Sequence, residues 1–95
     1  MHVTTVGSGD AFGSGGRFQT CIALASHSAA PPSVLLDCGA TSLTALRQQQ
    51  IDPNQIEAVL ITHLHGDHFG GLPFLVLDAQ FRRRTHDLTV WVTNG

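Results

Sequence analysis

Apolar residues along the chain fall into short runs separated by turn-forming residues, a pattern typical of a mixed α/β fold. Runs rich in β-branched side chains predict strands, and two stretches with apolar residues three to four positions apart predict helices. Glycine, proline, serine and asparagine lie between these segments, where turns are expected. The predicted strands are residues 2–6, 18–25, 34–37, 57–62 and 88–92, and the predicted helices are residues 42–50 and 70–81.

The two predicted helices differ in how much of their surface is apolar. In the first, Thr41 or Ser42 is placed to cap the N-terminus, and Leu43 and Leu46 mark a buried stripe. The second is apolar around most of its circumference, so it must be covered on more than one side. We expect the rest of a larger domain or a partner subunit, such as a second copy in a homodimer, to cover it. One face holds Leu72, Leu75, Val76 and Ala79, and the other holds Phe74, Leu77 and Phe81.

Length and charge limit what the chain can be. Its 95 residues form at most one domain, near the size at which a hydrophobic core becomes marginal. The net charge of −2 offers no electrostatic footprint for nucleic acid or an anionic membrane. All basic residues are arginines, which excludes a phosphate-loop lysine. No signal-peptide pattern or membrane-spanning stretch is visible, so a cytoplasmic location is the default expectation.

The main group of candidate functional residues lies directly after the apolar strand 57–62. His63, His65, Asp67 and His68 are four potential metal ligands within six positions, and imidazole and carboxylate suit zinc and its first-row neighbours. On an extended backbone His63 and His65 point the same way, whereas a turn at Gly66 brings Asp67 and His68 beside them. Two ligand pairs from one loop favour two metal ions close together. The alternatives are a histidine-rich surface turn without a metal or a site that binds metal only adventitiously.

Other candidate residues receive more modest interpretations. Asp37 interrupts an apolar run at a strand end, and we expect it to accept hydrogen bonds from the metal loop or from a ligand imidazole rather than to bind metal itself. Cys21 and Cys38 are interpreted as buried free thiols. Arg17 closes a glycine-rich loop; it either holds a substrate anion or is a surface arginine. Residues 82–84, three arginines, are expected to be solvated rather than to bind RNA, and His27 and His86 to be exposed loop histidines.

The motif His63-x-His65-x-Asp67-His68, preceded by an apolar strand and followed by Gly70-Gly71, resembles that of the metallo-β-lactamase-fold hydrolases. The resemblance implies an αββα sandwich with two metals at one edge of its sheets. It assigns His63 and His65 to the first metal and Asp67 and His68 to the second, with further ligands later in the chain. That fold needs roughly double this length. Met1 suggests a natural start, so residues 1–95 are expected to be the N-terminal half, inactive alone, with the C-terminal half missing.

The resemblance also suggests an activity. It implies hydrolysis by a metal-activated water, with two Zn²⁺ ions (or Mn²⁺ or Fe²⁺) and Asp67 as a catalytic residue. The motif and the following Gly71-Leu72-Pro73 are similar to the branch of transfer-RNA 3′-end-processing endonucleases and cyclic phosphodiesterases. The residues after Arg17 and after Gly39 depart from the endonucleases, which favours a small or nucleotide-type phosphodiester. Thioester or lactone hydrolysis, a di-iron redox centre and a non-catalytic metal module remain alternatives.

Overall fold

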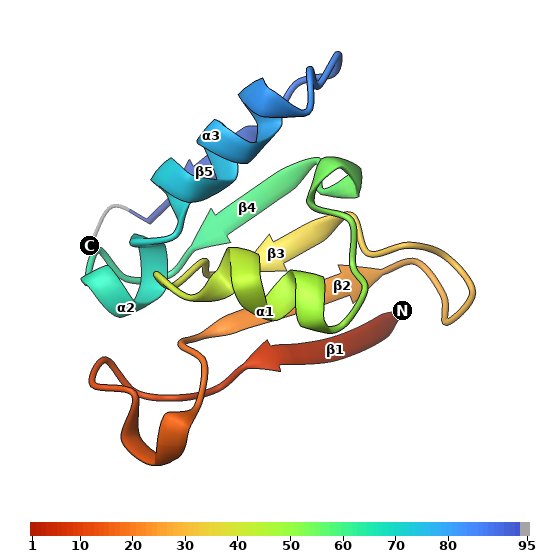
Figure 1. Cartoon of the computed structure of the whole chain (residues 1–95). Helices are drawn as coiled ribbons and strands as arrows, with labels where there is room; N and C mark the ends of the chain where they lie inside the picture. Colours follow the sequence, from red (N-terminus) through yellow and green to blue (C-terminus); the bar gives the residue numbers. More distant parts are fainter. Residues whose placement is uncertain (94–95) are drawn as a thin grey trace.

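A five-stranded mixed sheet forms the framework of the protein in a computed structural model that describes residues 1–93 (Figure 1). The strands lie side by side in chain order. The first three pair antiparallel, and the last two add in parallel. The strands are β1 (His2–Gly7), β2 (Cys21–Ala25), β3 (Val34–Leu36), β4 (Ala58–Ile61) and β5 (Thr89–Val92).

This pairing directs the ends of several strands to one edge of the sheet. Because β2 is antiparallel to both β1 and β3, and β3 is parallel to β4, the strands β1, β3 and β4 all run the same way. Their arrowheads point to the same side in Figure 1. The glycine-rich loop, the Asp37 loop and the histidine loop therefore leave the sheet at a common edge.

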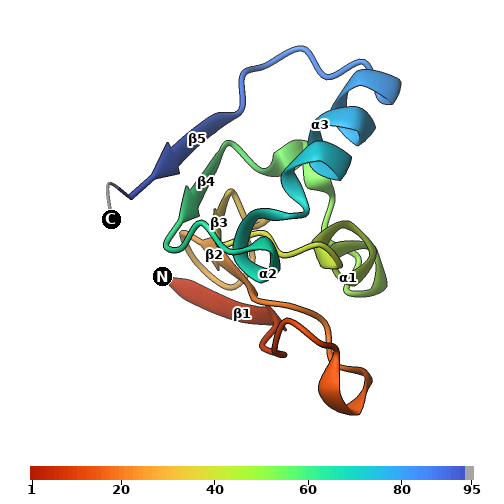
Figure 2. The ribbon, with the colours of Figure 1, turned by 90° about the vertical axis from the view of Figure 1, so that its left-hand side faces the viewer.

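The helices lie on one face of the sheet (Figure 2). They are α1 (Ser42–Gln48), α2 (Gly66–Phe69) and α3 (Leu72–Phe81), with the short 3₁₀ turns η1 (Ser14–Gly16) and η2 (Pro53–Gln55). A hydrophobic core fills the space between sheet and helices, because alternate strand residues point toward the helical layer. Its fully buried members include Leu35, Leu46, Ile56, Val59 and Ile61. No helix within residues 1–93 is long and apolar enough to cross a membrane.

The first predicted helix differs from expectation in its cap and its buried stripe. Thr41 occupies the N-cap position, but its hydroxyl forms no capping hydrogen bond with the helix. It instead accepts a hydrogen bond from the backbone amide of Gln19 at 2.8 Å. The buried residues are Ser42, Ala45 and Leu46, whereas Leu43 is only partly buried. The buried stripe therefore includes the polar Ser42 and only one of the two predicted leucines.

The predicted helix 70–81 is divided in two, and its apolar surface is only partly covered. Residues Gly70 and Gly71 separate α2 from α3. Leu75 is the buried member of the first predicted face, whereas Val76 of the same face is 46% exposed. The second face is largely open, as expected for a helix that needs a further covering layer: Phe74, Leu77 and Phe81 are 53%, 49% and 80% exposed.

One of the three consecutive arginines has a structural role that the sequence interpretation missed. Arg84 is only partly buried, yet its guanidinium donates hydrogen bonds to the carbonyl oxygens of Pro53, Ile56, His86 and Asp87. The prediction that residues 82–84 are all solvated is therefore wrong for Arg84. It joins η2 to the segment before β5. Its neighbours Arg82 and Arg83 are exposed, and so are His27 and His86, as predicted.

Candidate metal centre

Three loops meet at the edge of the sheet where β1, β3 and β4 end, and backbone hydrogen bonds hold them together. The Cys38 amide donates to the carbonyl of His68 at 2.7 Å, and the Gly71 amide donates to the carbonyl of Cys38 at 2.9 Å. The Gly39 amide donates to the carbonyl of Thr20 at 3.1 Å. The loop after β3 is thus fixed between the loop that follows β4 and the segment that precedes β2.

Close packing of backbone on backbone explains one glycine at this junction. A Cβ added to Gly39 would lie 2.5 Å from the carbonyl oxygen of Asp67 and 2.5 Å from the Cβ of Gln19. Real Cβ atoms do not approach other heavy atoms this closely, so only glycine lets the two loops touch. The Asp37 loop can therefore lie directly beneath the histidine loop.

Asp37 is a buried carboxylate with all its polar contacts supplied by the histidine loop. Its Oδ1 accepts a hydrogen bond from the Thr62 amide at 2.7 Å. Its Oδ2 lies 2.7 Å from the Thr62 hydroxyl and 2.9 Å from Nδ1 of His68. The residue adopts a left-handed backbone conformation with φ 61°, which non-glycine residues seldom adopt. The residue is 4% exposed, so burying its carboxylate is tolerable only because these three donors satisfy it.

The same contacts keep this carboxylate ionised. Burial acts to raise the pKa of Asp37, but hydrogen bonds from the Thr62 amide, the Thr62 hydroxyl and His68 act against it. Together with the charge of His68, they outweigh burial and hold the pKa below the ordinary carboxyl value. Asp37 is therefore a negatively charged acceptor at neutral pH.

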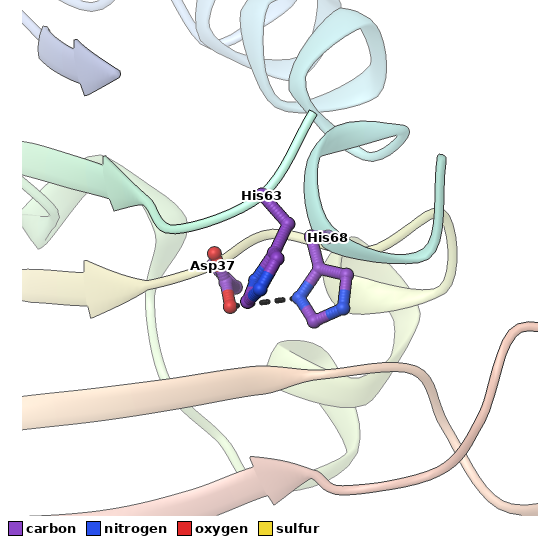
Figure 3. Close-up of side chains that lie close together, drawn as sticks. All are labelled: Asp37, His63 and His68. Atoms are coloured by element: carbon purple, nitrogen blue, oxygen red, sulfur yellow. Dashed lines mark hydrogen bonds and ion pairs between the residues drawn. The ribbon is translucent and has the colours of Figure 1, made fainter. Parts of the chain in front are cut away.

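Two of the four predicted ligands converge with Asp37 (Figure 3). One ligand atom each from Asp37, His63 and His68 lies within 4.8 Å of the others. The rings of His63 and His68 have centroids 4.8 Å apart and are tilted by 43°. Imidazole nitrogen and carboxylate oxygen are donors that Zn²⁺ and related divalent ions accept, and the donor set at this edge fits such an ion.

The other two predicted ligands lie at the margin of this group. The ring of His65 stacks on that of His63 with centroids 6.1 Å apart, and the residue is exposed. A carboxylate oxygen of Asp67 lies 3.4 Å from Nε2 of His68. All four side chains of the motif are thus gathered in one small region, although only His63 and His68 lie in the compact group with Asp37.

Gln19 connects the glycine-rich loop to this region and was not singled out from the sequence. Its side-chain oxygen accepts a hydrogen bond from the Ala40 amide at 2.8 Å, and its side-chain nitrogen donates to the carbonyl of Ala11 at 3.2 Å. No local pattern predicts this contact, because its partners lie 8 and 21 positions away. Arg17, in contrast, is exposed at the end of the loop.

The two cysteines are buried and free, as predicted. Burial raises the pKa of Cys21 to about 12 and that of Cys38 to about 11. Both are protonated thiols at neutral pH, and a thiol is a much poorer metal ligand and nucleophile than a thiolate. They contribute to the core beneath the loop junction rather than to its chemistry.

Residues 1–95 match the sequence profile of the family described as Anti-Pycsar protein Apyc1. The chain belongs to this family. It is also similar to proteins named Ribonuclease Z: 36% identical over 91 residues to that of Listeria monocytogenes serotype 4a (strain HCC23), and 36% over 95 residues to that of Bacillus thuringiensis (strain Al Hakam). These matches take in 96% and 100% of the chain but only 30% and 31% of the relatives. The chain thus spans about a third of their length.

Solved structures identify the fold of this family member. The metallo-β-lactamase fold protein YhfI from Bacillus subtilis superposes with a TM-score of 0.79 over 98% of the chain and 37% of its own, at 22% identity. The short form of human tRNase Z superposes with a TM-score of 0.67, at 26% identity, over 97% of the chain and 44% of its own. The predicted fold class, a mixed sheet with helices from the N-terminal half of a metallo-β-lactamase-type domain, is confirmed.

Proposed function

We propose that the chain is the N-terminal, metal-binding part of a longer metallo-β-lactamase-type domain that hydrolyses phosphodiesters. The observation that carries this proposal is that His63 and His68 converge beside the buried Asp37 carboxylate, with one ligand-type atom of each within 4.8 Å of the others, at an edge where three loops meet. The relatives named Ribonuclease Z, about three times as long as this chain, support both the length of the domain and the type of bond. Throughout, the intact protein means this chain together with any sequence that continues it.

The proposed ligands are the four side chains of the motif. His63 and His65 would hold one Zn²⁺, and Asp67 and His68 the second, with the remaining ligands supplied from beyond residue 95. Mn²⁺ or Fe²⁺ would suit the same donors. When bound, paired divalent ions lower the pKa of a nearby water and stabilise negative charge that develops on the substrate. Asp67, whose carboxylate lies beside His68, is the proposed catalytic residue of this chain.

The overall reaction is a hydrolysis. Water adds to phosphorus, one phosphorus–oxygen ester bond breaks, and the products are a phosphomonoester and an alcohol. The chain contributes the alignment of the donors, because Asp37 holds His68 through the 2.9 Å contact and the backbone bonds at Cys38 fix the histidine loop. Preorganised donors reduce the cost of reaching the transition state.

A small, nucleotide-type phosphodiester is the substrate that this chain supports best. A long RNA is held mainly through its phosphates by a basic surface, and the net charge of this chain is −2. The one cluster of arginines is partly used internally, because Arg84 donates to four carbonyl oxygens. RNA is the second candidate, favoured by the similarity to proteins named Ribonuclease Z.

The test begins with metal content and turnover of the intact protein. Purified without chelator, it should contain about two zinc ions per chain by mass spectrometry and hydrolyse bis(p-nitrophenyl) phosphate. Dialysis against a chelator should remove activity, and added Zn²⁺ should restore it. A cyclic nucleotide and a transfer RNA with a 3′ extension then separate the two substrate classes. Turnover of thioesters or lactones alone, or an iron centre that hydrolyses no phosphodiester, would overturn the proposal.

Variants of the motif test the assignment of residues. In the intact protein, His63→Ala or Asp67→Asn should abolish hydrolysis while the circular dichroism spectrum stays that of the folded protein, because neither side chain belongs to the buried core. His27→Ala, a change at an exposed histidine remote from the junction in sequence, is the matched control and should retain activity. Full activity and unchanged metal content in either motif variant would contradict the assignment.

A further inference from the structure

Thr62 occupies a position between the buried carboxylate and the first histidine of the motif. Its hydroxyl oxygen lies 2.7 Å from Oδ2 of Asp37 and 2.9 Å from Nδ1 of His63. Its amide donates to the other oxygen of the same carboxylate at 2.7 Å. Thr62 follows β4 directly, so the end of the strand fixes its backbone.

The number of available hydrogens decides which group donates in each contact. A hydroxyl has one hydrogen, and an ionised carboxylate can only accept. If the hydroxyl donated to His63, its oxygen and that of Asp37 would face each other at 2.7 Å without a hydrogen between them. The hydroxyl therefore donates to Asp37, and Nδ1 of His63 donates to the hydroxyl. The neutral His63 ring then carries its proton on Nδ1 and leaves the lone pair on Nε2.

The same carboxylate fixes the tautomer of the second imidazole, that of His68, through a direct hydrogen bond. Nδ1 of His68 lies 2.9 Å from Oδ2 of Asp37, so this nitrogen is also the donor, and Nε2 faces the carboxylate of Asp67 at 3.4 Å. Asp37 thus reaches His68 in one hydrogen bond and His63 in two, with the threonine hydroxyl as the intermediate group. Both carboxylate oxygens are occupied by these donors.

We propose that Thr62 is a positioning residue that fixes His63 as the Nδ1–H tautomer, so that Nε2 is presented to a divalent cation. In this arrangement Asp37 orients ligands and is not itself a ligand. This inference deepens the proposed function, since it concerns how the same metal site is prepared. Hydrogen bonds of this kind to the second nitrogen of a histidine ligand are worth about 10–100-fold in metal affinity.

The first experiment measures the tautomer in the metal-free intact protein, independently of any activity. Long-range ¹H–¹⁵N NMR spectra at a pH where the imidazoles are neutral distinguish a protonated Nδ1 from a protonated Nε2. Wild-type His63 and His68 should both be Nδ1–H. In Thr62→Val, which keeps the side-chain shape but lacks the hydroxyl, His63 should lose this preference and His68 should keep it. Thr62→Ser should restore the wild-type pattern at His63.

The second experiment measures zinc affinity by competition with a chromogenic chelator. Thr62→Val should bind Zn²⁺ about 10–100-fold more weakly than wild type, and Thr62→Ser should be close to wild type. A protonated Nε2 in wild-type His63, or a tautomer and affinity unchanged in Thr62→Val, would overturn the inference. Failure of wild type to bind any metal would instead contradict the proposed function, and the tautomer of the metal-free protein would still test the role of Thr62.

Discussion

Gly71 is the position where a single methyl group should do most damage to the junction that holds the histidine loop. An added Cβ would lie far inside 3.0 Å of the Gly39 carbonyl oxygen, and 3.1 Å from both the carbonyl oxygen and the Sγ of Cys38. The first of these neighbours is backbone and cannot rotate away. In Gly71→Ala the start of α3 must therefore move off the Asp37 loop, and the 2.9 Å hydrogen bond from the Gly71 amide to Cys38 is lost.

The expected magnitude follows from two costs and one gain. Overpacking a tight site costs roughly 1–3 kcal/mol. Leaving a buried amide or carbonyl without its partner costs roughly 1–3 kcal/mol more. Replacing glycine by alanine restricts the unfolded chain, which by itself stabilises the folded protein by about 0.4–1 kcal/mol. The net loss in the free energy of unfolding is then about 3 kcal/mol, a large part of the 5–15 kcal/mol typical of a domain.

Gly66→Ala is the matched control, because it makes the same chemical change five residues earlier, where an added Cβ meets nothing within 4 Å. It should change stability by less than about 1 kcal/mol, in the stabilising direction if at all. The assay is urea unfolding of the metal-free intact protein, with the slopes compared to confirm that the same transition is observed. A Gly71→Ala protein within about 0.5 kcal/mol of wild type, or a Gly66→Ala protein equally destabilised, would refute the packing argument.

Three further predictions follow from the described contacts. Arg84→Ala should lower the free energy of unfolding by about 2–3 kcal/mol, since carbonyl oxygens lose a charged donor, whereas the exposed Arg83→Ala should change it little; equal effects in urea unfolding would contradict this. The pKa of Asp37 is lowered on folding, so its stabilising contribution is complete above the ordinary carboxyl value of 3.8 and is lost as the pH falls through the lower folded value. Asp37→Asn should therefore weaken the loss of unfolding free energy at acidic pH, as urea unfolding over a pH series would show. The same loss as in wild type would argue against a contribution of the Asp37 charge to stability. Because burial raises the pKa of Cys21 to about 12 and that of Cys38 to about 11, neither thiol should react with iodoacetamide at pH 8 until urea unfolds the protein, as mass spectrometry would show.

The sequence alone determined most of the sheet, because strand formation here depends on local apolar runs. The run before His63 is β4, one residue shorter at each end than predicted, and the predicted strands 34–37 and 88–92 are β3 and β5. The position of the motif directly after a buried strand was equally local, since the ligand types and their spacing are written in six consecutive residues. Periodicity also predicted correctly that α3 would carry an uncovered apolar face.

Tertiary structure decided which distant groups serve this motif. The Asp37 carboxylate is 25 positions from Thr62 and 31 from His68; its place at a strand end predicted hydrogen bonds from the metal loop or an imidazole, but only the fold selects Thr62 and His68. At the break between α2 and α3 the Gly71 amide donates to the Cys38 carbonyl of the Asp37 loop, a tertiary contact that no local pattern specifies. Arg84 looked like a solvated charge because its four carbonyl partners are assembled only when η2 packs beside the turn before β5. Ligand types and apolar periodicity can be recognised within a few consecutive residues. Hydrogen-bond partners that are distant in sequence, in contrast, depend on how the sheet brings the loops together.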